Sequence, residues 1–195
     1  IKVFNQHFKT AITLNDVVSS YSGVRPLCDD ESSDPSAITR DYTLALHKQS
    51  DHNALISIYG GKITTYRKLS EAVLEKLSPF IPNASKPWTA SEPLPGSTKL
   101  GQDLNEIKRQ ICQAHSWLTQ TEIDRFAKSY GLLCLNFLKD KHSHRDLGEY
   151  LGAELFASEV DYLIEHEWAH TSEDILFRRT KLGLFLSDNE KQKLE

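Results

Sequence analysis

Three basic side chains in the first half of the sequence have the chemistry to bind a small phosphate ester. Arg25 lies in a Gly/Pro turn, "SGVRPL", Arg40 lies in "TRDY", and Lys62 follows two glycines in "GGKITTYR". Arginine forks and a lysine ammonium bind phosphate oxygens through charge-assisted hydrogen bonds. The alternative for each of them is an ordinary surface ion pair with a nearby aspartate (Asp29, Asp30 or Asp41).

The two adjacent glycines, Gly60 and Gly61, join an apolar β-branched run to an amphipathic segment that begins near Leu69. A strand, two glycines and a helix N-terminus allow a ligand to approach the backbone closely, beside unpaired N–H groups. A tight turn that merely needs unusual dihedral angles is the open alternative. A nucleotide P-loop is disfavoured, because Ile56 occupies the position of its first glycine and Ile63 follows the lysine.

The segment "HEWAH", His166–His170, matches the H-E-x-x-H pattern in which two histidines one helical turn apart bind zinc. We predict no metal here, because the surrounding sequence is that of a small helical domain. Trp168 and the apolar positions before it favour a helix packed in a core. The basic cluster 178–181, "RRTK", is expected to complement a helix C-terminus.

The elements that would position the three basic side chains belong to an α+β segment. A short helix is expected within residues 1–20 and a strand within 16–27. Two further strands, over 38–47 and 54–59, are expected to pair in antiparallel fashion. If they pair, Arg40 and Lys62 lie at the same end of the sheet. A Pro-rich linker over 78–99 follows the helix.

The remainder reads as an all-α domain. Apolar stripes predict a helix over 103–115, and Thr119–Glu122 is a capping box that opens the next helix, which stops at Gly131. A short apolar helix over 132–140 and three further helical segments follow, the last opened by a Ser187–Glu190 capping box. The expected domains are therefore 1–93 and 100–195.

Composition narrows the function classes. The chain has 195 residues, a net charge of −4 and a pI near 6.1, which argue against a nucleic-acid binder. No apolar run approaches the ~20 residues that cross a bilayer, and no signal-peptide pattern opens the sequence. The three cysteines form no C-x-x-C pair, which favours a reducing cytoplasm. Because the chain contains no methionine and starts at Ile1, we expect it to be part of a longer protein.

Three stretches together closely resemble bacterial aerobic glycerol-3-phosphate dehydrogenases, which are FAD-dependent and quinone-linked. They are "YSGVRPLCDDESSDPSAITRDY", "GGKITTYRKLSEAVLEKL" and "DILFRRTKLGL". The likeness runs from about residue 3 to 186. The fold that it implies is an α+β fragment of an FAD-dependent oxidoreductase domain, followed by an all-α C-terminal domain. The G-x-G-x-x-G fingerprint of such enzymes, which follows their first strand, is not in this sequence.

The resemblance assigns roles to particular residues. Arg25 and Arg40 match arginines at the substrate phosphate, and Lys62 matches a lysine close to both flavin and substrate, so it stands as the catalytic and substrate-binding candidate. The turn that abuts the flavin ring matches Gly60, Gly61, Lys62, Ile63 and Thr64. Backbone N–H groups and the helix dipole there would stabilise negative charge on the reduced ring. No metal is implied.

The activity implied by the resemblance is hydride transfer from glycerol 3-phosphate to FAD, which gives dihydroxyacetone phosphate, with electrons passed on to quinone. The implied location is cytoplasmic and peripheral on the inner membrane, without a nucleic-acid partner, and a homodimer is one expectation. We expect this chain alone to be inactive and not to retain FAD, because the pyrophosphate contacts belong to an absent βαβ unit. The alternatives are a glycerol-3-phosphate oxidase that uses oxygen, and a non-catalytic helical interaction module.

Overall fold

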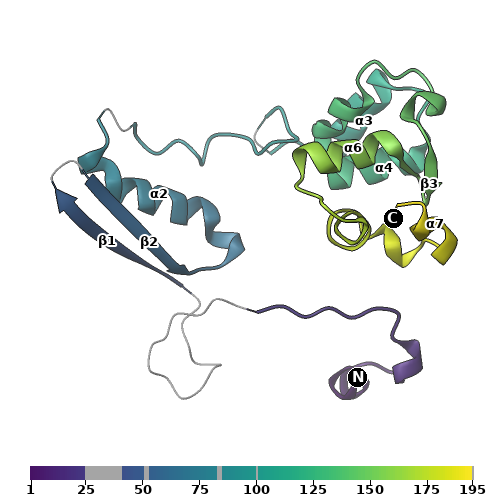
Figure 1. Cartoon of the computed structure of the whole chain (residues 1–195), viewed down its shortest axis with the longest axis horizontal. Coiled ribbons are helices and arrows are strands. Elements are labelled where there is room, and N and C mark those ends of the chain that lie inside the picture. The colour runs from purple at the N-terminus through teal and green to yellow at the C-terminus, as the bar shows by residue number, and fades with distance from the viewer. Residues whose placement is uncertain (25–40, 51–52, 83–84, 100, 195) are drawn as a thin grey trace. The chain divides into compact units, whose positions relative to one another are not determined.

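The structure is a computed structural model that describes residues 1–24, 41–50, 53–82, 85–99 and 101–194. The chain forms two compact units (Figure 1). Tyr21–Glu92 form one, and Ile1–Ser20 together with Pro93–Glu195 form the other. Each unit is described separately below.

The N-terminal segment carries the expected short helix, α1 (Lys2–His7), in which the rings of Phe4 and Phe8 stack 4.3 Å apart. A 3-10 turn, Leu14–Asp16, follows. The strand expected within 16–27 is wrong for its described part, since residues 17–24 have no regular structure. The reason is that no partner strand pairs with this segment in the described chain, and a strand without a ladder leaves its backbone groups to water.

The unit Tyr21–Glu92 contains an antiparallel hairpin followed by a helix. Strand β1 (Tyr42–Ser50) pairs with β2 (Asn53–Gly60) in a register that sets Tyr42 opposite Gly60. The predicted antiparallel pair is thereby confirmed. A 3-10 turn (Ile63–Thr65) leads into α2 (Tyr66–Leu77), and another (Ser78–Phe80) ends the helix.

Helix α2 packs on one face of the hairpin through its apolar side. The half-buried side of α2 carries the apolar residues of the amphipathic segment expected from Leu69 onward (Leu69, Ala72, Val73 and Leu77). Lys76 Nζ donates to the carbonyl oxygen of Leu44 at 3.0 Å, and Lys48 Nζ lies 5.3 Å from the ring centre of Phe80. None of the residues described in this unit is buried.

The larger unit is built from short helices. Its longer helices are α3 (Leu104–Ala114), α4 (Gln120–Ser129) and α6 (Ala157–His166). Shorter ones are α5 (Cys134–Leu138), the π-helical turn Asp174–Arg179 and α7 (Asp188–Gln192), with 3-10 turns at Gly131–Leu133, His144–Leu147 and Leu182–Leu184. Within the described ranges, no helix is both long and apolar enough to cross a membrane.

Both predicted capping boxes are present. At α4, the Thr119 hydroxyl accepts from Glu122 N–H, and Glu122 Oε2 accepts from Thr119 N–H at 2.8 Å. At α7, Ser187 and Glu190 form the same reciprocal pair. These bonds satisfy N–H groups that the helix itself leaves unpaired, so the sequence alone located both helix starts.

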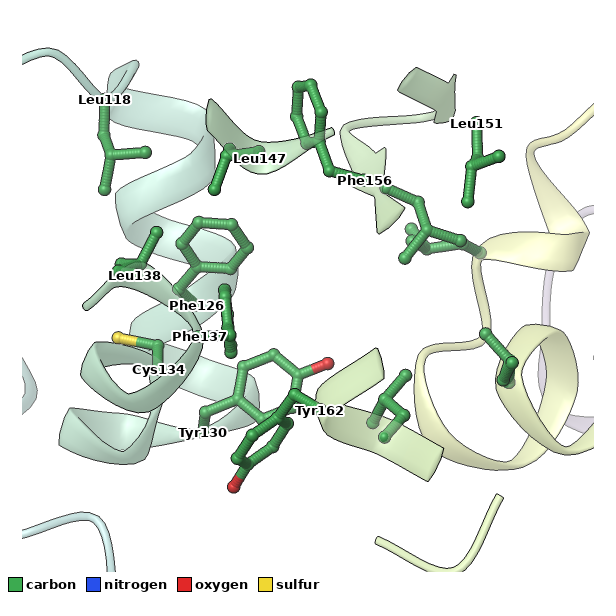
Figure 2. Close-up of a cluster of buried hydrophobic side chains, with 14 of the residues drawn as sticks. Leu118, Phe126, Tyr130, Cys134, Phe137, Leu138, Leu147, Leu151, Phe156 and Tyr162 are labelled. Atoms are coloured by element: carbon green, nitrogen blue, oxygen red, sulfur yellow. The ribbon is translucent and has the colours of Figure 1, made fainter. Parts of the chain in front are cut away.

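One hydrophobic core fills the larger unit (Figure 2). The ring of Phe137 lies edge-to-face with those of Phe126 and Tyr130, at 5.2 and 5.4 Å between ring centres. Helices α4, α5 and α6 supply most of the aromatic side chains, and the core also includes Leu118, Leu147 and Leu151. This core belongs entirely to residues 107–194 of the described chain.

The expectation of a purely helical domain needs one correction. Strands β3 (Tyr150–Gly152) and β4 (Leu155–Phe156) form a small hairpin inside the larger unit. Its turn residues, Ala153 and Glu154, have φ angles of 46° and 63°, which non-glycine residues rarely adopt. Arg125 Nη2 donates to the Glu154 carbonyl at 2.6 Å and stabilises the turn. No local sequence pattern predicts this contact.

Candidate functional site

The glycine turn places an exposed three-residue segment at the end of β2. Gly60 and Gly61 both have positive φ, at 73° and 102°. A Cβ added to Gly61 would lie 3.5 Å from Tyr42 Cβ, which is an ordinary contact. The requirement for glycine at position 61 therefore comes from its backbone conformation and not from crowding.

Beyond the glycines the chain is fixed by its own backbone. Lys62 is extended, with φ −106° and ψ 142°, and its carbonyl accepts both from Thr65 N–H at 3.0 Å and from Thr65 Oγ1 at 2.9 Å. The three residues that follow the glycines (Lys62, Ile63 and Thr64) are exposed. Ile63 is 89% exposed.

The start of α2 carries an uncompensated positive dipole end. No side chain caps it, and its first turn holds no acidic residue. The N–H groups of Ile63 and Thr64 find no acceptor among the described residues. Free donors beside two glycines fit the electron-rich edge of a ring or an anion. The turn is thus chemically suited to the flavin that the sequence suggested.

Arg25 and Arg40 lie outside the described residues. Their expected position near Lys62 therefore stays a prediction. The register of the hairpin does place Tyr42, two residues after Arg40, opposite Gly60.

A second feature, which the sequence reasoning missed, lies one turn further along α2. Glu71 Oε1 accepts from Thr89 Oγ1 at 2.5 Å and from Arg67 Nη1 at 3.2 Å. The Thr89 hydrogen bond holds the pKa of Glu71 below its ordinary value against the opposing effect of desolvation, and the charges of Arg67 and Lys68 act in the same direction as Thr89. The signal that could have found this link is the Arg67–Glu71 spacing, an i,i+4 pair on one helix face.

A groove of about 720 Å³ lies between α2 and the chain at Ile81 and at residues 85–89. Its walls include Tyr42, Glu71 and Trp88, and none of the five residues at the candidate flavin turn lines it. The groove and the turn are consequently separate features of this unit.

The structure removes the geometric basis for zinc at "HEWAH". Helix α6 ends at His166, Glu167 is its C-cap, and Trp168 has φ 56°. His166 and His170 are therefore not on successive turns of one helix. In the described ranges, no three His, Cys, Asp or Glu side chains gather as a metal site would require. The expected core position of Trp168 is wrong, because the side chain is 81% exposed.

The "RRTK" cluster has a structural role in the described chain. Arg179 Nε donates to the Glu167 carbonyl at 2.7 Å, so it caps the end of α6, a helix other than its own. Arg178 Nη1 pairs with Asp174 at 3.0 Å. The expectation that these charges complement a helix C-terminus is correct for Arg179. The helix that Arg179 caps is α6, which it reaches through a tertiary contact.

Two parts of the molecule define its class: a βα segment with a glycine turn suited to an electron-rich ligand, and a separate helical domain with its own core. A family model described as the C-terminal domain of alpha-glycerophosphate oxidase matches residues 87–195. The chain belongs to this family.

Curated relatives match the chain from end to end. It is 47% identical over 194 residues to a glycerol-3-phosphate dehydrogenase of Pseudomonas aeruginosa and 41% identical to the aerobic glycerol-3-phosphate dehydrogenase of Escherichia coli K12. It is also 36% identical over 191 residues to the D-erythritol 1-phosphate dehydrogenase of Brucella abortus. The chain spans 38% of the length of each of these relatives. The resemblance inferred from the sequence is confirmed.

Proposed function

We propose that this chain is the C-terminal part of an FAD-dependent dehydrogenase that oxidises glycerol 3-phosphate to dihydroxyacetone phosphate. The observation that carries the proposal is the match of the whole chain to glycerol-3-phosphate dehydrogenases. The glycine turn supports it, because its free N–H groups and uncapped helix dipole suit a ring that gains negative charge. Residues 1–93 would then be part of the FAD and substrate domain.

The chain's own residues would bind and orient the substrate. FAD, when bound, would accept the hydride from C2 of the substrate. Arg25 and Arg40 would grip the phosphate with their guanidinium forks, and Lys62, exposed at the turn, would reach towards both ring and substrate. The register supports a shared location, since the start of β1 lies opposite Gly60.

Two alternatives concern the substrate and the electron acceptor. The relative named D-erythritol 1-phosphate dehydrogenase favours a longer polyol phosphate as a second candidate substrate. The family description names an oxidase, which would pass electrons to oxygen instead of quinone. All these activities share a phosphate ester of a polyol, so the proposed roles of Arg25 and Arg40 are the same in each.

The finer expectations follow from the dehydrogenase proposal. Electrons would pass to quinone, and the enzyme would lie on the cytoplasmic face of the inner membrane, with a homodimer as its expected assembly. This chain alone would not retain FAD, because only ring-side residues are present. A helical interaction module without catalysis is the competing proposal for residues 100–195.

The test is steady-state kinetics of the longer enzyme, with glycerol as a substrate that lacks the phosphate. We expect Arg25→Ala and Arg40→Ala each to lower the apparent affinity for glycerol 3-phosphate by about tenfold to a hundredfold, the value of one charge-assisted hydrogen bond. Oxidation of glycerol should change little. Arg→Lys should recover only part of the loss, because an ammonium cannot form a bidentate fork.

Lys62→Ala should lower kcat as well as the affinity for the substrate, since the Lys62 side chain is proposed to face both the flavin ring and the substrate. Arg109→Ala is the matched control, because Arg109 is an exposed arginine of the helical unit, with 66% of its side chain accessible. Wild-type Michaelis constants for both Arg25→Ala and Arg40→Ala would show that the phosphate is bound elsewhere.

A further inference from the structure

The chain at Thr89 is fastened to helix α2, although the sequence placed it in a linker. Thr89 Oγ1 donates to Glu71 Oε1 at 2.5 Å and accepts from Arg67 Nη1 at 3.4 Å. Arg67 Nη1 also donates to Glu71 Oε1 at 3.2 Å, so the three side chains form a closed triangle of hydrogen bonds, which we call the latch. Because Thr89 is 18 and 22 residues away from its two partners, the latch is a tertiary contact.

The latch lies on a helix start that carries two cations. Arg67 and Lys68 are the second and third residues of α2, and its first turn holds no acidic residue. Cations at this end oppose the helix dipole. Glu71, whose side chain is 16% exposed, contacts both of them, with Oε2 at 3.6 Å from Lys68 Nζ. The hydrogen bond from Thr89 holds the pKa of Glu71 below its ordinary value, so this carboxylate is charged at neutral pH and offsets the two cations.

The same part of α2 supports the glycine turn. The atoms nearest to a Cβ placed on Gly61 would be Tyr42 Cβ at 3.5 Å and Leu69 Cδ2 at 3.8 Å. Leu69 lies on α2 two residues before Glu71, and Tyr42 lines the groove together with Glu71 and Thr89. A shift of the first turns of α2 would therefore move the side chains that support Gly61.

We propose that Glu71 and Thr89 are positioning residues for the glycine turn, which fix the first turns of α2 and set the charge that a flavin at the turn would meet. The inference rests on the proposed function, since it takes flavin as the ligand of the turn. Both residues act through Arg67 and the backbone of α2. A reduced flavin carries negative charge, so a more positive helix start would stabilise it, and a fixed carboxylate moderates that effect.

The charge is tested by the midpoint potential of the flavin in the longer enzyme. Glu71→Gln keeps the size of the side chain and removes its charge, so Arg67 and Lys68 act without compensation on the reduced ring. We expect the equilibrium constant for flavin reduction to rise about threefold to tenfold, which makes the potential of a two-electron couple about 15–30 mV more positive. Glu75→Gln is the matched control, because Glu75 is an exposed carboxylate one turn further along α2. An unchanged or more negative potential in Glu71→Gln, or an equal rise in Glu75→Gln, would overturn the proposal.

The fastening is tested through the Thr89 hydroxyl, because its removal leaves every charge in place. Thr89→Val keeps the shape of the side chain without the hydroxyl, and Thr89→Ser keeps the hydroxyl. We expect the amides of 63–69 and 88–92 in the longer enzyme to exchange at least about threefold faster in Thr89→Val, because a released helix start opens more often. Thr89→Ser should exchange at the wild-type rate. Wild-type rates in Thr89→Val, or equally fast exchange in both variants, would overturn the proposal.

The two measurements separate this inference from the proposed function. An active enzyme whose potential in Glu71→Gln and exchange rates in Thr89→Val match those of the wild type would refute the inference and leave the proposed function standing. An enzyme that binds flavin but oxidises no polyol phosphate would refute the proposed function. Neither the potential nor the exchange rates require substrate, so in that enzyme they would still decide the role of the latch.

Discussion

A buried ion pair ties distant parts of the helical unit together. Arg125 Nη1 and Nη2 each donate to one oxygen of Glu159 at 2.7 Å, and Tyr130 Oη donates to Glu159 Oε1 at 2.5 Å. Glu159 is only 1% exposed. Burial, together with the neighbouring Glu159 charge, raises the pKa of Tyr130 and raises that of the Cys134 thiol to about 12, so both stay protonated at neutral pH.

Replacing one partner of this pair should be costly. Glu159→Gln leaves the Arg125 guanidinium buried without its counter-charge, and breaking such a pair typically costs about 3–5 kcal/mol of unfolding free energy. Urea unfolding followed by circular dichroism measures the loss. Glu165→Gln is the control on the same helix, because Glu165 is 72% exposed and its removal should change stability by no more than about 0.5 kcal/mol. A loss of similar size in both variants would contradict this account of the pair.

Glu122 makes the stability of the helical unit depend on pH in the acidic range. Desolvation would raise its pKa, but hydrogen bonds from the His144 ring, 3.0 Å away, and from Thr119 outweigh it, so its pKa lies below the ordinary 4.5. A depressed carboxyl pKa contributes stability that is present above about pH 4.5 and is lost as the pH falls through the folded-state pKa.

Glu122→Gln should therefore destabilise the helical unit at pH 7 by about 1–2 kcal/mol, the net value of hydrogen bonds to a charged group. The difference from wild type should shrink as the pH falls from 5 to 3, which thermal unfolding across that range would measure. A difference that stays constant with pH would mean that the charge of Glu122 contributes nothing.

At the scale of elements, the segment before α3 is joined to the end of α4 through two glycines. Leu132 N–H donates to the Gly96 carbonyl at 2.8 Å, and Gly131 has φ 58°. A Cβ on Gly131 would overlap the Gly96 carbonyl oxygen, so the backbones approach too closely for any side chain. The glycine that the sequence marked as a helix stop is also a packing requirement.

Gly131→Ala should thus cost more than the roughly 1 kcal/mol of an unfavourable φ, because the backbone contact must also open; we expect about 2–3 kcal/mol. Gly101→Ala separates the two effects, since Gly101 also has positive φ, at 69°, but nothing lies within 4 Å of its added Cβ. Thermal unfolding of the two variants measures the difference. If Gly101→Ala cost as much, the close approach would not matter.

At the scale of the whole molecule, the two units differ in how much they bury. The helical unit holds all the buried residues of the described chain, whereas the unit Tyr21–Glu92 holds none. We therefore expect residues 93–195 to fold alone with a cooperative helical melt by circular dichroism, because domain stability follows the core. Limited proteolysis of the 195-residue chain should cut first within 42–92. Rapid degradation of both units together would argue against an independent helical domain.

The sequence alone determined the features whose causes are local. The capping boxes at Thr119 and Ser187, the apolar stripe of α2 and the antiparallel β1–β2 pair each follow from residues within a few positions of one another. The glycine turn after β2 was located in the same way, and its two positive φ angles are what adjacent glycines permit. The family resemblance rests partly on the same residues, since "GGKITTYRKLSEAVLEKL" covers both the glycine turn and α2.

Only the tertiary structure decided the features that depend on distant partners. The end of α6 at His166 is fixed by Arg179, which caps it from another element, and this removes the histidine pair that the linear pattern suggested. The β3–β4 hairpin depends on Arg125, which is 29 residues before the carbonyl that it holds. Periodicity and capping signals act within one or two helical turns. Contacts across such separations leave no local pattern, so burial, pairing and exposure at these positions come from packing.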